Sequence, residues 1–318
     1  MRPEGFRLRR VMSPRFLGYG FAILGVLIIS PDSALIRKVG MDPAALLFWR
    51  GFGIFVVSAV LSVLWYRGRL LSYFTESGVL GLLIALFFFI STCSFVYSAV
   101  TLNPIVLLIF VALGPVSGAV FSIILLNEPP RLAVWIAIGL SFLGMAIVVW
   151  GEMHGAGTLE QLRAGQRPNL PGPLSLLALI LVPTLLGLGF TLARKLKQPN
   201  VWPSNALAGV MAMAIMPFIA PSLVVPSGIF WEFWFLVIFV SGVSFILITL
   251  APKFISSAET SLVFLLETVL GSLWIWGLLG QRPEGHEIAG GAVVTLAVIV
   301  VVVSAARQKS STSTLPPT

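Results

Sequence analysis

Three ionisable residues lie inside long apolar segments of the sequence, where charged side chains are rare. They are Asp32, Arg50 and Glu267. If these segments cross a membrane, each charge costs roughly 3 kcal/mol on insertion scales. Such a residue is expected to bind a substrate, carry a proton or pair with another charge. These three side chains are therefore the first candidates for a substrate or ion pathway.

Asp32 and Arg50 lie near the same end of two consecutive apolar segments. Asp32 is about four residues before the end of the first segment, and Arg50 is about six residues into the second. At about 1.5 Å per residue both lie roughly 6 to 9 Å below one surface, so the spacing allows an ion pair. Either the pair is a structural bridge, or Arg50 receives an anionic substrate group and Asp32 exchanges a proton. Pro31 favours a functional role because it can kink the helix that presents Asp32.

Glu267 is about eleven residues into its segment, close to the middle of a bilayer. Burial disfavours the charged carboxylate, so Glu267 is a candidate proton carrier. The alternative is a permanently protonated acid that is hydrogen-bonded to a neighbouring helix. Glu259, near the inner end of the same segment and close to Ser256, is either a pathway residue or an interfacial one.

Two aromatic residues complete the candidate pathway. Trp49 precedes Arg50 and could stack on an aromatic or cationic ligand, although packing explains it as well. Tyr97, at the outer end of the third segment, could donate a hydrogen bond to a substrate or serve packing.

No cofactor or metal site is predicted. The single cysteine, Cys93, lies in an apolar segment, and His154 and His286 have no ligand partners at metal-binding spacing. The phosphate-binding pattern GxxxxGK[ST] does not occur, so ATP-driven pumping has no support. An enzyme active site needs a cluster of titratable groups, and the sequence has only scattered charges. We therefore expect no enzyme.

The elements that must position these residues are membrane-spanning helices. Of 318 residues, 58% are hydrophobic and 10% are charged, and the mean hydropathy is +1.01, far above that of water-soluble domains. Because about 20 apolar residues span a bilayer, the sequence predicts an all-α membrane protein with ten transmembrane helices. The expected spans are 16–36, 44–66, 78–102, 105–126, 132–150, 173–193, 204–224, 230–250, 256–279 and 288–304.

The distribution of charge predicts the orientation. With the N-terminus inside, 14 of the 20 basic residues fall on the inner side, five fall on the outer side, and Arg50 lies within a helix. The positive-inside rule then puts both termini in the cytoplasm. The net charge of +8 follows from this orientation, so no nucleic-acid partner is expected.

The two halves of the chain are related. A shift of 153 positions superimposes LGPVSGAVFSIILLNEPP, from Leu113, on LETVLGSLWIWGLLGQRP, from Leu266. The polar residues after the helix and the glycine-containing helix that follows recur in both copies. Five spans per half would insert the second copy upside down relative to the first, which is an arrangement typical of transporters.

Several of these segments resemble the EamA repeat of the drug/metabolite transporter superfamily. They are SFVYSAVTLNP, LGPVSGAVFSIILLNEPP and WIAIGLSFLGMAIVVW, with FWRG at 48–51 similar to the family's arginine pattern. The second half matches more loosely, and Gln281 stands where the first half has Glu128. The resemblance implies two inverted five-helix repeats, a brace at a helix junction for Glu128, and a transporter of polar metabolites or drug-like compounds without ATP.

The sequence thus predicts a secondary active transporter, an exporter or exchanger, that works by alternating access in a bacterial inner membrane. A channel or facilitator and a non-transport scaffold remain alternatives, and an intramembrane enzyme is the least favoured. The expected partners are a small-molecule substrate, the lipid bilayer, protons as a coupling ion and a second copy of the chain. The expected parts are a basic leader (1–15), a first repeat (16–151), a polar loop (152–172), a second repeat (173–306) and a tail (307–318).

Overall fold

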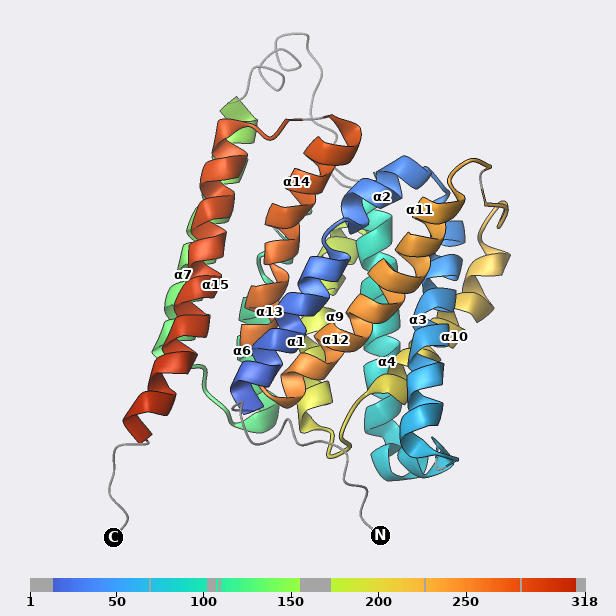
Figure 1. Cartoon of the computed structure of the whole chain (residues 1–318), viewed down its shortest axis with the longest axis horizontal. Coiled ribbons are helices and arrows are strands. Elements are labelled where there is room, and N and C mark those ends of the chain that lie inside the picture. The colour runs from blue at the N-terminus through green and yellow to red at the C-terminus, as the bar shows by residue number, and fades with distance from the viewer. Residues whose placement is uncertain are drawn as a thin grey trace.

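The described structure is helical throughout (Figure 1). It is a computed structural model that describes residues 14–68, 70–101, 107, 110–154, 173–225, 227–280 and 282–312. Most of the expected leader, polar loop and tail, and Gln281, lie outside these residues. The helices are α1 Pro14–Ile29, α2 Asp32–Val39, α3 Pro43–Tyr66, α4 Leu70–Thr101, α6 Gly114–Leu126, α7 Leu132–His154, α9 Pro173–Lys195, α10 Trp202–Ile215, η2 Met216–Phe218, α11 Phe230–Trp234, η3 Phe235–Val243, α12 Ser244–Leu250, η4 Ala251–Lys253, α13 Ser257–Phe264, α14 Leu266–Leu279 and α15 Gly285–Thr312.

Eight helical segments in the described residues are long and apolar enough to cross a membrane. The fourth and seventh expected spans correspond to shorter helices, α6 with 13 residues and α10 with 14. The prediction of a helical membrane protein is confirmed. The count of ten spans is confirmed only for the eight longer segments.

Four of the spanning segments are interrupted, and one of them is α4, in which Gly78 has a non-helical backbone with φ of 53°. The first spanning segment consists of α1 and α2, which are separated by Ser30 and Pro31. The segment Phe230–Lys253 contains η3, a nine-residue π-helix between α11 and α12. The segment Ser257–Leu278 consists of α13 and α14, which meet at Leu265. Breaks of this kind free backbone groups and commonly lie where a helix lines a cavity.

Local signals explain where several helices begin and end. Asp42 caps α3, because its side chain accepts hydrogen bonds from the backbone N–H groups of Ala44 and Ala45. Gly40 ends α2 in the left-handed conformation, with φ of 60°. The short turn between α2 and α3 thereby connects the two helices that carry Asp32 and Arg50.

The helices pack in pairs drawn from different halves of the chain. α7 packs along α15, α3 along α10, and α6 against α13. α4 packs on α9, as α12 packs on α1. Figure 1 shows α7 and α15 at the left edge of the bundle, running in opposite directions. The core therefore forms between the halves rather than within each of them.

Gly53 lies at one of the closest approaches in the bundle. A Cβ atom there would overlap the backbone carbonyl oxygen of Val237 in η3. Backbone atoms cannot move aside as a flexible side chain can, so Gly53→Ala is expected to destabilise the protein by more than about 3 kcal/mol. Detergent-solubilised protein should lose most of its folded fraction in a thermal melt. Gly139→Ala is the matched control, because no atom lies within 4 Å of a Cβ at that position. Equal melting of both variants would contradict the prediction.

Candidate functional site

A cavity in the middle of the bundle brings together two of the three predicted intramembrane charges. Arg50 of α3 and Glu267 of α14 both line it. The other lining residues are apolar or carry hydroxyl groups: Ile29, Ile54, Ser91, Thr92, Phe95, Val111, Val182, Pro183, Leu186, Ser241, Phe245, Ile248 and Phe264. Both halves of the chain therefore contribute to its wall.

The cavity has room for several water molecules. It has about 750 Å³ of empty space, counted out to its open mouth, and the centres of water-sized spheres can occupy about 60 Å³ of it. A single buried water needs roughly 10 to 15 Å³ by the second measure. The space is thus several times what one water requires.

The predicted ion pair between Asp32 and Arg50 is confirmed. Arg50 donates a hydrogen bond from Nη1 to Oδ1 of Asp32. Asp32 is 0% exposed and Arg50 is 5% exposed, so each charge is separated from water and relies on the other. Two atoms of the pair, Oδ2 of Asp32 and Nε of Arg50, are buried without a hydrogen-bond partner.

Glu267 lies in the first turn of α14, directly after the break at Leu265. Its side chain is 5% exposed, and none of the described residues donates a hydrogen bond to its carboxylate. Asp32 and Arg50 are the charged groups that act on it electrostatically. The helix start favours a negative charge at this position, because the unpaired backbone N–H groups of the first turn carry partial positive charge.

The hydroxyl groups of the cavity were not among the residues predicted from the sequence. Ser91 and Thr92 lie one after the other on α4, and Ser91 donates a hydrogen bond to the backbone oxygen of Val182 at 3.1 Å. This contact lies beside Pro183, which interrupts the hydrogen bonding of α9. The adjacent serine and threonine within an apolar helix were the only sequence signal for these two residues, because Pro183 belongs to a different helix.

Two of the other predicted site residues lie away from the cavity. Trp49 donates a hydrogen bond from Nε1 to the backbone oxygen of Leu223 at 3.0 Å. Its ring also packs edge to face against Phe233 and Trp234 of α11. Tyr97 lies on α4 beyond Phe95, is half-buried, and is not among the residues that line the cavity.

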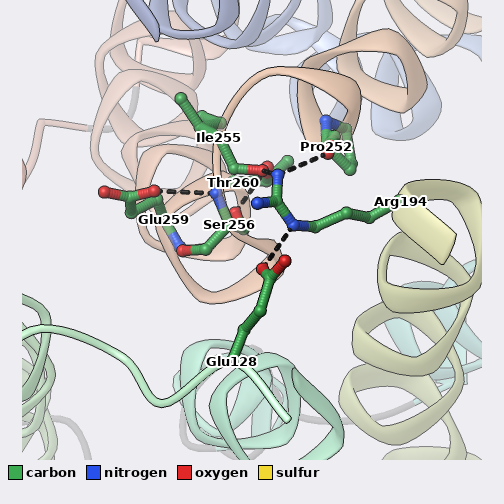
Figure 2. Close-up of polar contacts among 7 residues, drawn as sticks. All are labelled: Glu128, Arg194, Pro252, Ile255, Ser256, Glu259 and Thr260. Carbon is green, nitrogen blue, oxygen red and sulfur yellow. Dashed lines mark hydrogen bonds and ion pairs between the residues drawn. The ribbon is translucent and has the colours of Figure 1, made fainter. Parts of the chain in front are cut away.

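Glu259 lies in the first turn of α13 and is held by three contacts. It accepts a hydrogen bond from the hydroxyl of Tyr19 at 2.8 Å. It also forms a capping box with Ser256, whose backbone N–H donates to Oε2 of Glu259 at 2.7 Å (Figure 2). This carboxylate therefore stabilises the start of α13 and ties it to α1.

Arg194 connects three segments at the same end of the bundle. Figure 2 shows its guanidinium between Glu128, which follows α6, and the segment that leads into α13. Nε donates to Oε2 of Glu128 at 2.8 Å, and Nη1 donates to the backbone oxygens of Pro252 at 3.2 Å and Ile255 at 3.0 Å. The expectation that Glu128 braces a helix junction is confirmed. The sequence assigned Arg194 only to the orientation of the chain, and its bracing role appears only in the structure.

Comparison with known proteins identifies the first half of the chain. The model of the EamA-like transporter family matches residues 16–150. This stretch contains Asp32, Arg50 and Glu128, so the resemblance found in the sequence is confirmed there. The protein is accordingly a multi-pass integral membrane protein.

Solved structures share the fold over nearly the whole chain. In total, 28 chains match. One, described only as the crystal structure of a protein, has a TM-score of 0.69 and 17% sequence identity, and the match covers 93% of this chain and 98% of that one. At this identity the likeness concerns the fold alone. No curated protein matches the sequence.

Proposed function

We propose that the protein is a secondary active transporter that moves a small polar metabolite or drug-like molecule across the cytoplasmic membrane. One observation carries the proposal: the cavity between the two halves is lined by Arg50 and Glu267, both almost fully buried. Ionisable side chains that face an internal cavity at membrane depth are expensive to maintain and typical of substrate and ion pathways. The EamA-like family of residues 16–150 supports transport as the function.

The packing of the helices supports an inverted repeat of five helices per half. If α1 to α7 and α9 to α15 are two copies, the pairs α3 with α10, α6 with α13 and α7 with α15 each join equivalent helices. The same repeat relates α4 to α12 and α9 to α1, so the contact of α4 with α9 corresponds to the contact of α12 with α1. Inverted repeats allow alternating access, because an exchange of the two conformations opens the opposite side.

One end of the bundle is closed beneath the cavity. The Arg194 contacts join α9 to the segments around Glu128 and Ile255 there. The backbones of Gly118 and Gly187 also approach closely, since a Cβ at Gly187 would lie 2.8 Å from the amide nitrogen of Gly118. This end carries the basic turns and is assigned to the cytoplasm by the positive-inside rule. Export or exchange with protons as the coupling ion would require these contacts to open in each cycle.

The test is a flux measurement on the full chain in proteoliposomes with a cavity-filling variant. Thr92→Trp puts a bulky ring into the cavity wall, so it should reduce saturable uptake by at least about tenfold, which corresponds to about 1.4 kcal/mol. Val100→Trp on the same helix is the control, because Val100 is 42% exposed on the outside of the bundle. Amino acids, nucleosides, vitamins and cationic dyes form the substrate panel.

Accelerated uptake against preloaded unlabelled substrate would support a transporter, because exchange requires a binding site that alternates between sides. Flux that does not saturate and shows no such acceleration would instead indicate a channel or facilitator. If no compound in the panel crosses, or if Thr92→Trp transports as well as Val100→Trp, the proposal fails.

A further inference from the structure

A second cavity lies at the turn between α3 and α4, at the lower edge of the bundle in Figure 1. It has about 800 Å³ of empty space, counted out to its open mouth, which is within the range of roughly 300 to 1,000 Å³ that small-molecule sites occupy. None of its lining residues belongs to the wall of the central cavity. The lining residues are Trp65, Tyr66, Arg67, Ser72, Glu76 and Gln198.

Contacts between distant segments form the wall of this second cavity. Gln198, which follows α9, donates a hydrogen bond from Nε2 to Oε2 of Glu76 in α4 at 2.7 Å. The hydroxyl of Tyr66, the last residue of α3, donates to Oδ1 of Asn200 at 3.4 Å. The end of α3, the start of α4 and the turn before α10 therefore enclose one space.

The cavity presents one positive and one negative charge. Arg67 and Glu76 both line it, and both residues are exposed. Arg67 takes part in none of the ion pairs formed among the described residues. Its guanidinium matches the geometry of a phosphate group, to which it can donate two parallel hydrogen bonds. A ligand that carries both a phosphate and an ammonium group would satisfy both charges, whereas a ligand of one sign would be repelled by one of them.

The mouth of the cavity lies beside surface that faces lipid. Leu64 and Leu71 are next to lining residues in the sequence and are 65% and 82% exposed, as expected of apolar side chains on a membrane-spanning helix that contact acyl chains. The ring of Trp65 lies edge to face against Trp202, with centroids 5.7 Å apart. Tryptophan rings near the ends of spanning helices lie at the level of the lipid head groups. The cavity thus opens where phospholipid head groups lie.

We propose that this cavity binds the head group of a zwitterionic phospholipid with a primary ammonium group, of the phosphatidylethanolamine type. Arg67 donates to the phosphate, the carboxylate of Glu76 accepts from the ammonium, and the acyl chains lie along the apolar surface at Leu71. A primary ammonium has three N–H donors, whereas the quaternary ammonium of phosphatidylcholine has none. A purely anionic head group gains nothing from Glu76. The site is separate from the central cavity and does not depend on the proposed transport function.

The test measures how lipids stabilise the purified, delipidated full chain in detergent, because a ligand of the folded state raises the melting temperature. The probes are phosphatidylethanolamine, phosphatidylcholine and phosphatidylglycerol with identical acyl chains. Phosphatidylethanolamine should reach its half-maximal effect at a mole fraction at least about fivefold below that of either other lipid, a difference of about 1 kcal/mol. Glycerophosphoethanolamine and inorganic phosphate, added at the same concentrations, should have little effect, because they lack acyl chains.

Variants assign the two halves of the head group to the two charges. Glu76→Gln removes the charge but can keep the hydrogen bond with Gln198, and it should abolish the preference for phosphatidylethanolamine over phosphatidylcholine. Arg67→Gln should weaken the binding of both lipids at least about fivefold, because both carry the phosphate. Glu232→Gln and Arg37→Gln are the matched controls, since both residues are charges on α11 and α2 at the opposite end of the bundle (Figure 1). Both controls should bind lipid as the wild type does.

Native mass spectrometry of the same variants counts the bound lipids, so a substitution that lowers the melting temperature by itself is still tested. Equal stabilisation by the three lipids, tighter binding of phosphatidylglycerol, or a preference for phosphatidylethanolamine that survives Glu76→Gln overturns the proposal. Stabilisation by glycerophosphoethanolamine or inorganic phosphate equal to that by the lipid would indicate a soluble phosphate compound as the ligand and would also overturn the lipid site.

Discussion

Arg50→Ala is expected to destabilise the folded protein by roughly 3 to 5 kcal/mol, because it leaves the carboxylate of Asp32 buried without a counter-charge. Asp32 is 0% exposed, so water cannot take the place of the guanidinium. Unfolding in mixed micelles with increasing sodium dodecyl sulfate measures the loss.

The matched double variant isolates the cause of that loss. Asp32→Asn combined with Arg50→Gln replaces two charges by two neutral hydrogen-bonding groups and should recover more than half of the stability lost by Arg50→Ala alone. Lys38→Ala serves as the control, because its pair with Glu232 is about one-third exposed on each side, and an exposed pair contributes about 0 to 1 kcal/mol. If Arg50→Ala costs no more than Lys38→Ala, the buried pair is not a structural lock.

Glu267→Gln is expected to abolish substrate-dependent proton movement in proteoliposomes. Glutamine has nearly the shape of glutamic acid but cannot release a proton, so the coupling step would be lost while the fold is kept. Wild-type protein should acidify or alkalise the vesicle lumen when substrate is added, and a pH-sensitive dye trapped inside measures this change. The rate should fall by at least about a hundredfold, equivalent to about 2.7 kcal/mol.

Glu267→Asp should retain measurable proton movement, since the carboxylate remains but its reach is shorter. Substrate flux without proton movement in the wild type, unchanged in Glu267→Gln, would make Glu267 a structural residue and would point to facilitated diffusion or exchange. Loss of substrate flux together with loss of thermal stability in Glu267→Gln would mean that the acid supports the fold, which would refute its role as a carrier.

The ion pair between Asp32 and Arg50 shows which contacts could be predicted from the sequence. Asp32 and Arg50 lie on helices that a short turn joins, so their depths could be counted at a fixed rise per residue. Their contact was therefore predictable as feasible, and the structure confirms it. Glu267 is more than 200 positions further along the chain, and no local rule predicts which helix face it shares with Arg50.

Trp49 and Arg194 illustrate where sequence interpretation was incomplete. Trp49 is a neighbour of Arg50 in sequence, yet successive side chains on a helix point about 100° apart. Trp49 consequently joins an aromatic cluster with Phe233 and Trp234. In the sequence Arg194 resembles any basic residue in a turn assigned to the inner side. Only folding brings it within reach of Glu128 and the carbonyl of Ile255.

The sequence by itself determined the class of protein: apolar segments of sufficient length, basic turns and three intramembrane charges follow from composition and from fixed helix geometry. Tertiary structure alone decided which charged residues line a cavity and which form structural ion pairs or hydrogen bonds. The physical reason is that hydropathy and helical rise act along the chain, whereas the cavity joins α3, α4, α9, α12 and α14 through packing between distant segments. Whether a buried charge is paired depends on that packing.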